Sequence, residues 1–561
     1  MSVRRGNGDH GRNATALRER LGIRMASNQN VETAGLLQRM ALSMSKGAPQ
    51  GYRRACLSAH VDRYGVSAAV TNVLASGRAR PGPQDFRKQL SKLYDLDKTG
   101  ADELGVELAV DPTGRFEAVI SRALISQPGT VPGTDRCLYV LRPDVLPPDA
   151  GADQPGPSNA TWSGDPEEAV RLLGRYLKKR AEIFELPEGD LEWMPAPLEA
   201  AEIDALEQAL GFGLPGDLRA LYAVADGDGG DDGARLMDRH LWFDLERLVA
   251  RYHSDPWWVA GSSWRNHHLH AVRHDAIPYG IVRRSTRRPG WIPFAETTGG
   301  DFLAVDLDPA EGGRPGQVIR VGRNYDDGPV YVADSMTTLL RLQLEALERG
   351  EYECDVENGE LWIKTASLPD RRPSALRHSS VQEAAASLDD VQELVATGET
   401  DLEPLRAARR LLRVRLSDAA SVGLAALCGV PLESLELDLG SVDLAPLAEH
   451  PTLRTVTVKT AAPLSLAPLR SCPQLYGLDL SHASVRDIEV LAEMKGLLYL
   501  SLRYEQWLEL WECTDSLPSL VVPVLAGTTT PGKLAEWAAR FGDGSESHDV
   551  QYYSGQLMAS E

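Results

Sequence analysis

The sequence predicts a multi-domain protein in which two α+β domains precede a C-terminal α/β repeat solenoid. Its 561 residues suit three or four domains of roughly 150 residues each. Helix and strand patterns alternate up to residue 366, and an apolar repeat begins after residue 400. The expected parts are a disordered tail (1–30), an α+β domain (31–187), a second α+β domain (188–366), a linker with a capping helix (367–400), the repeats (401–512) and a C-terminal segment (513–561).

The first domain is expected to combine helices with an antiparallel sheet. Strand patterns cover residues 64–74, 104–110 and 116–120. Between the last two, Asp-Pro-Thr-Gly (111–114) places Pro second and Gly fourth in a type I turn, which predicts a hairpin. Asp165, followed by Pro and two Glu, predicts the cap and first turn of a helix that ends near residue 184. This order of elements resembles that of YezG-type immunity proteins.

The second domain begins with two helices and continues with strands. Ile203, Leu206 and Leu210 form one apolar stripe, and Gly211 stands where a C-cap glycine belongs. A short helix follows at 214–222. Strand patterns at 291–296, 301–308 and 317–321 then precede an amphipathic closing helix at 335–350.

The segments LGFGLPGDLRALY, WIPFAETTGGDFLAVDL and QVIRV, followed by the closing helix, resemble the Smi1/Knr4 (SUKH) superfamily. The resemblance implies an α+β fold with a mixed sheet packed by helices, and no enzymatic activity. Many bacterial members are immunity proteins that neutralise polymorphic toxins, and fungal members are regulatory scaffolds linked to cell-wall synthesis. Residues 239–288 depart from the family as an insertion rich in Trp, His and Arg. The fold signature falls on Leu214, Pro215, Trp291, Pro293, Gly300 and Asp301.

The third domain is a repeat array. The pattern L-x-x-[LV]-x-[LV] begins at residues 411, 432, 453, 475 and 497. A spacing of 21 or 22 residues is the signature of leucine-rich repeats. Leu444, Leu447, Leu466, Leu469 and Leu491 supply the apolar side of the return segments. The asparagine of the repeat is missing, which predicts a short and less regular solenoid.

Two features of the array bear on function. The variable strand positions, which include Tyr476 and Tyr499, are expected to line one exposed face that either binds a partner or is merely solvated. Trp507 and Trp511 are four residues apart and are expected to cap the open core of the last repeat.

Residues 226–233 form an acidic, glycine-rich run that does not fit a calcium loop. An EF-hand needs a ligand at its fifth position and Glu at its twelfth, where this chain has Gly230 and Met237. The run therefore reads as a flexible loop or as an acidic protein-contact loop. Nearby tryptophans either fill the core or form a contact surface, since Trp is frequent in binding hot spots. The candidate partner-binding residues are Asp226, Asp228, Asp231, Asp232, Trp257, Trp258, Trp264, Tyr476 and Tyr499.

No metal, cofactor or catalytic site is expected. Six histidines fall between residues 240 and 274, but no HExxH pattern accompanies them. The six cysteines form neither a CxxC pair nor a disulfide framework. Glu296, Asp301 and Asp306 are close in sequence, although strand alternation is expected to separate them. The chain also lacks the GxSxG, Walker A and GxGxxG motifs that would indicate an enzyme.

Charge and composition favour a protein-binding role. The net charge of −21 argues against nucleic-acid binding, which needs clustered Lys and Arg, and favours a basic protein partner. No apolar stretch approaches the length of a membrane span, and no secretory signal is evident, so a cytoplasmic protein is expected. The leading hypothesis is an immunity protein that binds and occludes a toxin domain. The alternative is a regulatory scaffold that holds cellular partners through its SUKH and repeat domains.

Overall fold

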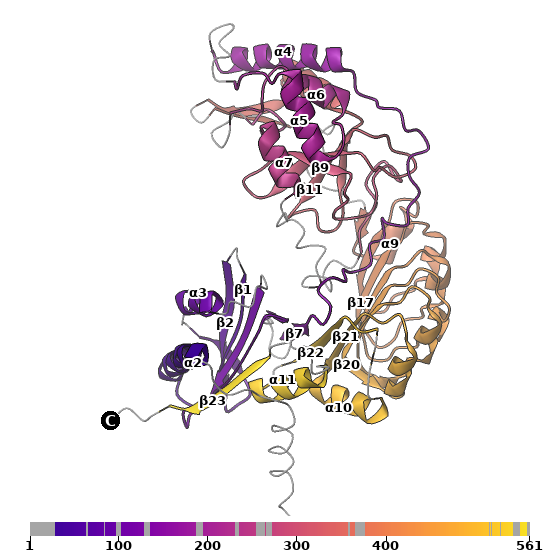
Figure 1. Cartoon of the computed structure of the whole chain (residues 1–561). Coiled ribbons are helices and arrows are strands. Elements are labelled where there is room, and N and C mark those ends of the chain that lie inside the picture. Colours follow the sequence, from indigo (N-terminus) through magenta and orange to yellow (C-terminus); the bar gives the residue numbers. More distant parts are fainter. Residues whose placement is uncertain are drawn as a thin grey trace, which may run out of the picture. The chain divides into compact units, whose positions relative to one another are not determined.

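The chain divides into two compact units (Figure 1). The first comprises residues 1–145, 396–406 and 415–561, and the second comprises residues 146–395 and 407–414. The computed structural model describes residues 28–62, 65–82, 85–96, 103–127, 135–186, 194–229, 235–253, 264, 272–356, 359–364, 376–514, 517, 519–527, 529–541 and 550–557.

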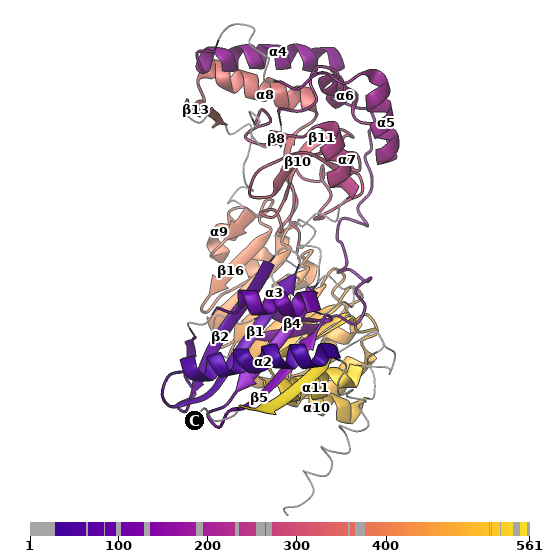
Figure 2. The same ribbon diagram turned by 60° about the vertical axis from the view of Figure 1, so that its left-hand side comes forward.

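A six-stranded antiparallel sheet forms the N-terminal part of the first unit. Its strands are β1 (Tyr52–Asp62), β2 (Gly65–Leu74), β3 (Ala79–Pro81), β4 (Glu103–Val110), β5 (Arg115–Ser121) and β23 (Gln551–Gln556), in the order β23-β5-β4-β1-β2-β3. Helices α2 (Asn28–Gly47) and α3 (Arg87–Leu96) cover one face (Figure 2). Because alternate side chains of β1, β4 and β5 point toward these helices, they build one core.

The predicted hairpin between β4 and β5 is confirmed. The amide of Gly114 donates to the carbonyl of Asp111 at 3.0 Å, and Gly114 has a φ of 83°. The Asp111 carboxylate accepts from the amide of Thr113 at 2.9 Å. The turn is therefore stabilised by its first residue as well as by its glycine.

A parallel ladder forms the rest of the first unit, with strands at the predicted repeat spacing. It comprises β17 (Arg413–Ala419), β18 (Ser434–Leu439), β19 (Thr455–Leu464), β20 (Gly477–Val485), β21 (Tyr499–Arg503) and β22 (Val522–Ala526). Short 3₁₀ segments return the chain between strands: η6 (Ala425–Gly429), η7 (Ala445–Leu447), η8 (Ala467–Ser471) and η9 (Ile488–Glu493). The leucines predicted for these returns are buried.

The last repeat ends in an aromatic cluster on α10 (Tyr504–Cys513) and α11 (Pro531–Ala538). Trp507 is fully buried and lies 5.6 Å from Trp511, 6.0 Å from Trp537 and 5.4 Å from Phe541 between ring centroids. The Trp507 indole donates to the carbonyl of Val524 at 3.1 Å. The predicted capping role of Trp507 and Trp511 agrees with this geometry.

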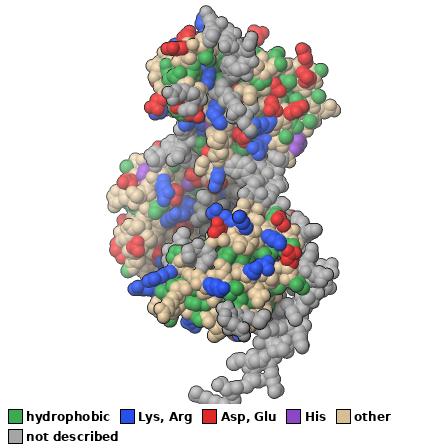
Figure 3. Space-filling model, turned by 90° about the vertical axis from the view of Figure 1, so that its left-hand side faces the viewer, with side chains coloured by type: hydrophobic (Ala, Val, Ile, Leu, Met, Phe, Trp, Pro, Cys, Tyr) green, Lys and Arg blue, Asp and Glu red, His purple; other side chains and the backbone are tan. Residues whose placement is uncertain are grey.

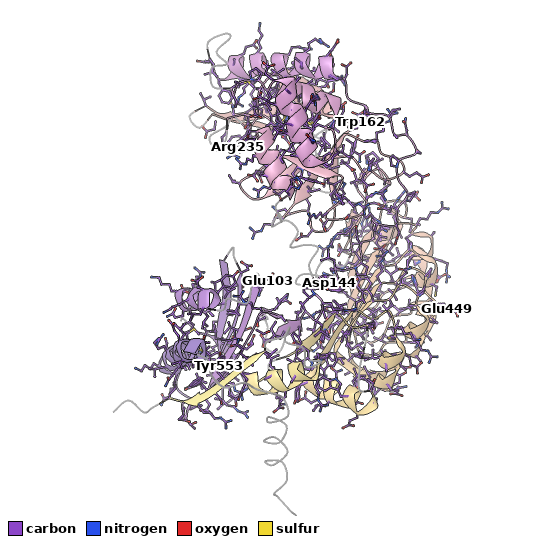
Figure 4. All side chains as sticks on the ribbon, in the orientation of Figure 1. Glu103, Asp144, Trp162, Arg235, Glu449 and Tyr553 are labelled. Carbon is purple, nitrogen blue, oxygen red and sulfur yellow. The ribbon has the colours of Figure 1, made fainter. Side chains whose placement is uncertain are left out.

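Two strand pairings join the ends of the sequence within the first unit. The hairpin of β6 (Leu124–Gln127) and β7 (Arg136–Tyr139) continues the repeat sheet, because β7 pairs antiparallel with β22. The C-terminal strand β23 pairs with β5, and Tyr553 of this strand is labelled in Figure 4. The expectation of separate N-terminal, repeat and C-terminal parts is thus corrected, because they share strand ladders.

The second unit is built on a five-stranded sheet in the order β12-β11-β10-β9-β8. These strands are β8 (Leu241–Trp242), β9 (Trp291–Glu296), β10 (Asp301–Asp306), β11 (Gln317–Gly322) and β12 (Val330–Ala333). Their pairs are all antiparallel, which corrects the expected mixed sheet. The turns from β9 through β12 are too short for parallel crossovers. Parallel and antiparallel pairs are combined in the sheet that contains the repeats instead.

Helices surround this sheet: α4 (Pro166–Ile183), α5 (Ala200–Leu210), α6 (Gly216–Tyr222), α7 (Leu245–His253) and α8 (Met336–Arg349). As predicted, Asp165 caps α4 through the amide of Glu168, at 3.0 Å, and Gly211 ends α5 in the left-handed conformation. However, α4 was assigned to the first domain. It lies alongside α8 instead (Figure 2) and buries Leu173, Tyr176 and Leu177 in the core of the second unit.

Shorter elements follow α8 in the sequence, and those up to residue 395 belong to the second unit. A hairpin of β13 (Tyr352–Asp355) and β14 (Glu360–Ile363) follows α8. The segment predicted as a linker with a capping helix contains β15 (Arg377–His378), α9 (Val381–Ala385) and β16 (Glu393–Thr397), with η5 (Glu403–Ala407) after it. β15 and β16 pair in parallel.

Candidate partner-binding site

The acidic loop, defined here as residues 223–240, connects α6 to β8. The α6 helix begins after Pro215, whose φ of −51° suits a helix start. Leu214, Leu218 and Leu221 are buried beneath it, and the Tyr222 hydroxyl donates to the carbonyl of Phe243 at 3.0 Å. The signature residues Leu214 and Pro215 therefore fix the point from which the loop departs.

The first two carboxylates of the loop anchor backbone atoms. Asp226 is half-buried and accepts from the amide of Leu245 at 2.8 Å, at the first turn of α7. Asp228 is fully buried and accepts from the amide of Leu236 at 3.0 Å. Burial raises the pKa of Asp228 to about 6. Asp228 was predicted to contact a partner, but its side chain is enclosed and holds the two ends of the loop together.

The end of the loop rests on a buried ion pair. Arg320 of β11 binds Asp238, and each side chain is 2% exposed. Burial, with Arg320 nearby, lowers the pKa of His240 to about 4, so this imidazole is neutral at pH 7. Its Nδ1 lies 2.7 Å from the carbonyl oxygen of Asp238.

The backbone around the Arg320–Asp238 ion pair is strained. Arg235, Asp238 and Arg239 have φ values of 51°, 48° and 67°, which side-chain-bearing residues seldom adopt. The strain is held by the Arg320–Asp238 contact and by Gln343 of α8, whose amide donates to the carbonyl of Leu236 at 3.4 Å. The tip of the loop, with the predicted contacts Asp231 and Asp232, lies outside the described residues.

The predicted aromatic contacts are buried where they can be placed. Trp264 is 3% exposed, which agrees with the core-filling alternative. Tyr476 is 4% exposed and Tyr499 3%, which corrects the expectation that they line an exposed face. The repeat sheet continues into β7, and the Arg136 guanidinium donates to the Tyr499 hydroxyl at 3.4 Å. Trp257 and Trp258 lie outside the described residues.

The remaining signature residues shape the β9–β10 turn. Trp291 is buried, and Pro293 lies in β9 opposite Ala304. Gly300 has a φ of 83°, and its amide donates to the carbonyl of Thr297 at 3.1 Å. Asp301 accepts from the backbone amide of Asn324 at 2.9 Å and from its side-chain amide at 2.8 Å. These residues maintain the fold, as the resemblance implied.

The three carboxylates near this turn do not converge on one site. Glu296 pairs with Arg247 and with Arg251, the latter at 2.7 Å. Asp306 is fully buried and accepts from the side-chain amide of Gln317 at 2.8 Å. Burial raises the pKa of Asp306 to about 7. Each carboxylate has a different structural partner, as strand alternation predicted.

The sequence patterns missed a junction between residues 272–284 and the segment that precedes the repeats. The amide of Asp275 donates to the Gln392 side-chain oxygen at 2.7 Å, and the Gln392 side-chain nitrogen donates to the carbonyl of Asp275 at 3.2 Å. The Tyr279 hydroxyl donates to Asp390 at 2.8 Å, and Arg410 stacks on the Tyr279 ring at 3.7 Å. This part of the insertion therefore packs against Asp390, Gln392 and Arg410 within the second unit.

Within the described part of the chain, no group of three or more His, Cys, Asp or Glu side chains is arranged to hold a metal ion. His267, His268 and His270 of the predicted histidine group lie outside that part. Among the same described residues, no helix has the length and apolar content to cross a membrane. Acidic and basic side chains are interspersed on the face shown in Figure 3.

Residues 197–342, which run from just before α5 into α8, match the model of the SMI1/KNR4 family (SUKH-1). This stretch of the chain is a SUKH-1 domain. The resemblance inferred from the sequence is thereby confirmed, and the insertion lies inside the matched range.

Three curated relatives match part of the chain. A KNR4/SMI1 homolog of Yarrowia lipolytica is 42% identical over 104 residues and covers 18% of this chain and 14% of the relative. A glucan synthesis regulatory protein of Neurospora crassa is 29% identical over 203 residues, covering 31% and 38% respectively. The cell wall biosynthesis/cell cycle regulator smi1 of Schizosaccharomyces pombe is 31% identical over 169 residues, covering 29% and 33%. This chain thus spans well under half of each relative's length.

Among solved structures, an internalin C2 of Listeria monocytogenes is similar at 17% identity, with a TM-score of 0.20. It covers 29% of this chain and 87% of the internalin chain. A score this low carries no argument about the fold.

Proposed function

We propose that the chain is a non-enzymatic regulatory protein that holds protein partners. The SUKH-1 domain would be its main binding module, and the parallel ladder, as a leucine-rich-repeat solenoid, its scaffold. The names of the Neurospora crassa and Schizosaccharomyces pombe relatives, both regulators, support regulation rather than catalysis. The buried carboxylates among the described residues of the domain support the same view, since they bind structural partners and do not form an acid–base pair in a common site.

The acidic loop is the observation that carries this proposal. Asp226, Asp228 and Asp238 hold its base at three points. Asp231 and Asp232 follow in sequence between these anchors. A loop with an anchored base loses less conformational entropy on binding than a free one. A net charge of −21 would accelerate encounter with a basic partner.

The test is affinity capture of the tagged full chain from its own cells at low and at high salt. We expect partners that salt weakens and that an Asp231→Lys/Asp232→Lys variant loses. An Asp389→Lys/Glu489→Lys variant is the matched control, because it reverses two exposed carboxylates elsewhere. Retention of every partner by the loop variant would overturn the role of the loop, and substrate turnover by the purified chain would overturn the non-enzymatic assignment.

Toxin neutralisation is the second candidate, favoured by the acidic charge of the chain and by the acidic loop. Toxin domains that act on nucleic acid are themselves basic, so an acidic inhibitor gains association rate. Capture of one basic toxin domain, whose activity the chain abolishes in a purified assay, would favour this candidate. Capture of several cellular proteins whose activities the chain modulates would favour regulation.

A further inference from the structure

An extended segment lies along the SUKH-1 domain ahead of α4. Residues 146–164, named here the strap, form no helix or strand. The residues that receive the strap, at 281–288 and 308–316, are named here the seat, and they belong to the same compact unit. At the end of the strap, Trp162 lies against Gly316, where an added Cβ would come within 3.0 Å of the indole (Figure 4).

The seat recognises the strap mainly through the backbone. Arg283 is 6% exposed, and its guanidinium donates to the carbonyl of Gly151 at 3.2 Å and also to that of Gln154. Its Nε donates to the carbonyl of Asp308 at 3.0 Å. Near the middle of the strap, the amide of Ser158 donates to the carbonyl of Glu311 at 2.9 Å.

Three residues of the strap give this contact its sequence selectivity. A Cβ on Gly151 would lie 3.0 Å from the backbone of Arg284, which is tighter than an ordinary contact, so a larger residue would have to displace this backbone. Asp149 accepts from the Ser285 hydroxyl at 2.9 Å and lies 3.6 Å from Arg288. The side-chain oxygen of Gln154 accepts from the amide of Arg284 at 2.7 Å. The recognised pattern is Asp-x-Gly-x-x-Gln.

The strap is weakly buried although its seat is well formed. Leu146 is 58% exposed and Trp162 48%, so the strap contributes little to the hydrophobic core. Each hydrogen bond between the strap and the seat contributes only about 0.5–1.5 kcal/mol to the stability of the bound strap. Arg283, however, is buried, and its Nη1 would lose the carbonyls of Gly151 and Gln154 if the strap left. Its Nε and Nη2 would keep their contacts to Asp308. The seat therefore offers a buried donor to an occupant's backbone, and most of the contacts to that occupant are available from any extended chain with the same pattern.

We propose that the seat is a peptide-binding site, that the strap fills it in cis, and that an extended segment of a partner carrying Asp-x-Gly-x-x-Gln replaces the strap in trans. This site uses none of the residues of the acidic loop. Its test is therefore independent of the proposed function.

The test measures binding of a dye-labelled peptide, LPPDAGADQPGPSN (residues 146–159), to the full chain by fluorescence polarisation. The strap variant Asp149→Ala/Gly151→Val/Gln154→Ala removes the anchors in cis. We expect it to bind the peptide at least tenfold more tightly than the unmodified chain does. A peptide with Val in place of Gly151 is the matched control and should bind neither protein. Adding Arg283→Met to the strap variant should abolish binding of the unmodified peptide.

Hydrogen exchange of residues 149–158 shows whether the strap leaves its seat in the strap variant. A failure to bind the peptide can therefore be interpreted. Faster exchange without selective binding of the glycine peptide would show that the seat does not accept a peptide in trans. Unchanged exchange would show that the strap does not leave its seat. Either result overturns the proposal, and because the control peptide requires no change to the protein, misfolding of a variant cannot imitate the expected selectivity.

Discussion

At the scale of single residues, the SUKH-1 domain uses its acidic side chains chiefly as internal connectors. Asp228 holds a backbone amide, Asp238 holds Arg320 and Asp306 holds Gln317. The described part of the acidic run, residues 226–229, forms no helix or strand, as predicted, but the burial of Asp228 was not predicted. Its partner amide lies across the loop, and Arg320 lies 82 residues after Asp238, so a local pattern of Asp and Gly cannot indicate either contact.

The buried Asp306 predicts a pH-dependent stability. Its folded-state pKa, raised by burial to about 7 from a usual value of 3.8, means that the folded domain retains a proton that the unfolded chain releases above about pH 4. The contribution of this group to the free energy of unfolding is therefore complete below pH 4. It is lost as the pH rises toward 7, by on the order of 4 kcal/mol.

The measurement compares the full chain with Asp306→Asn by urea unfolding at several pH values, followed by hydrogen exchange in β10. The Asn side chain does not titrate, so the difference in unfolding free energy between the two proteins should decrease from pH 4 to pH 7. A difference that stays constant over this range would contradict the prediction. Exchange in β4 of the first unit serves as an internal control.

At the scale of elements, local patterns predicted what local forces determine. The cap at Asp165, the αL glycine after α5 and the β4–β5 turn are each set by neighbouring residues, and each is present. The domain into which a helix packs was harder to predict. The apolar face of α4 would suit any core that helices cover. Its packing against α8 is decided by contacts with residues about 170 positions away, which include Thr337.

The C-terminal strand β23 predicts a specific effect of truncation. It supplies the edge partner of β5, with Tyr552 opposite Val119 and Ser554 opposite Glu117. A chain ending at residue 549 would leave the backbone groups of this edge unpaired. We expect amide exchange in β5 to accelerate at least tenfold, measured by mass spectrometry. A chain ending at residue 557 keeps β23 and should exchange as the full chain does, and equal exchange in both truncations would refute the pairing.

At the scale of the whole molecule, the sequence order of the domains differs from their structural grouping. The first unit combines the beginning and the end of the sequence, because β7 extends the repeat sheet and β23 extends the N-terminal sheet. The repeat period was visible in the sequence because each repeat contacts its neighbours. The closing of the ladder by β7 was not visible, since strands nearly 400 residues apart pair without any periodic signal.

An ion pair at this closure tests whether the grouping stabilises the protein. Arg136 of β7 binds Asp479 of β20 at 2.6 Å, and the two side chains are 21% and 6% exposed. Burial alone would raise the pKa of Asp479, but Arg136 and the Ser481 hydroxyl hold it below its usual value. Arg136→Met would leave this carboxylate buried without its cation. We expect the free energy of unfolding of the first unit to fall by about 2–4 kcal/mol.

The same substitution should also accelerate amide exchange in β22 and β7, because the pairing between these two strands would open more often. Arg115→Met, which removes an exposed arginine paired with Glu117, is the matched control and should change neither quantity. Adding Asp479→Asn to Arg136→Met removes the uncompensated charge, and recovery of part of the loss would give the coupling energy of the pair. Equal stability of the Arg136 and Arg115 variants would mean that the ion pair adds no stability. The hairpin of β6 and β7 would then be held on the repeats by its backbone pairing with β22 alone.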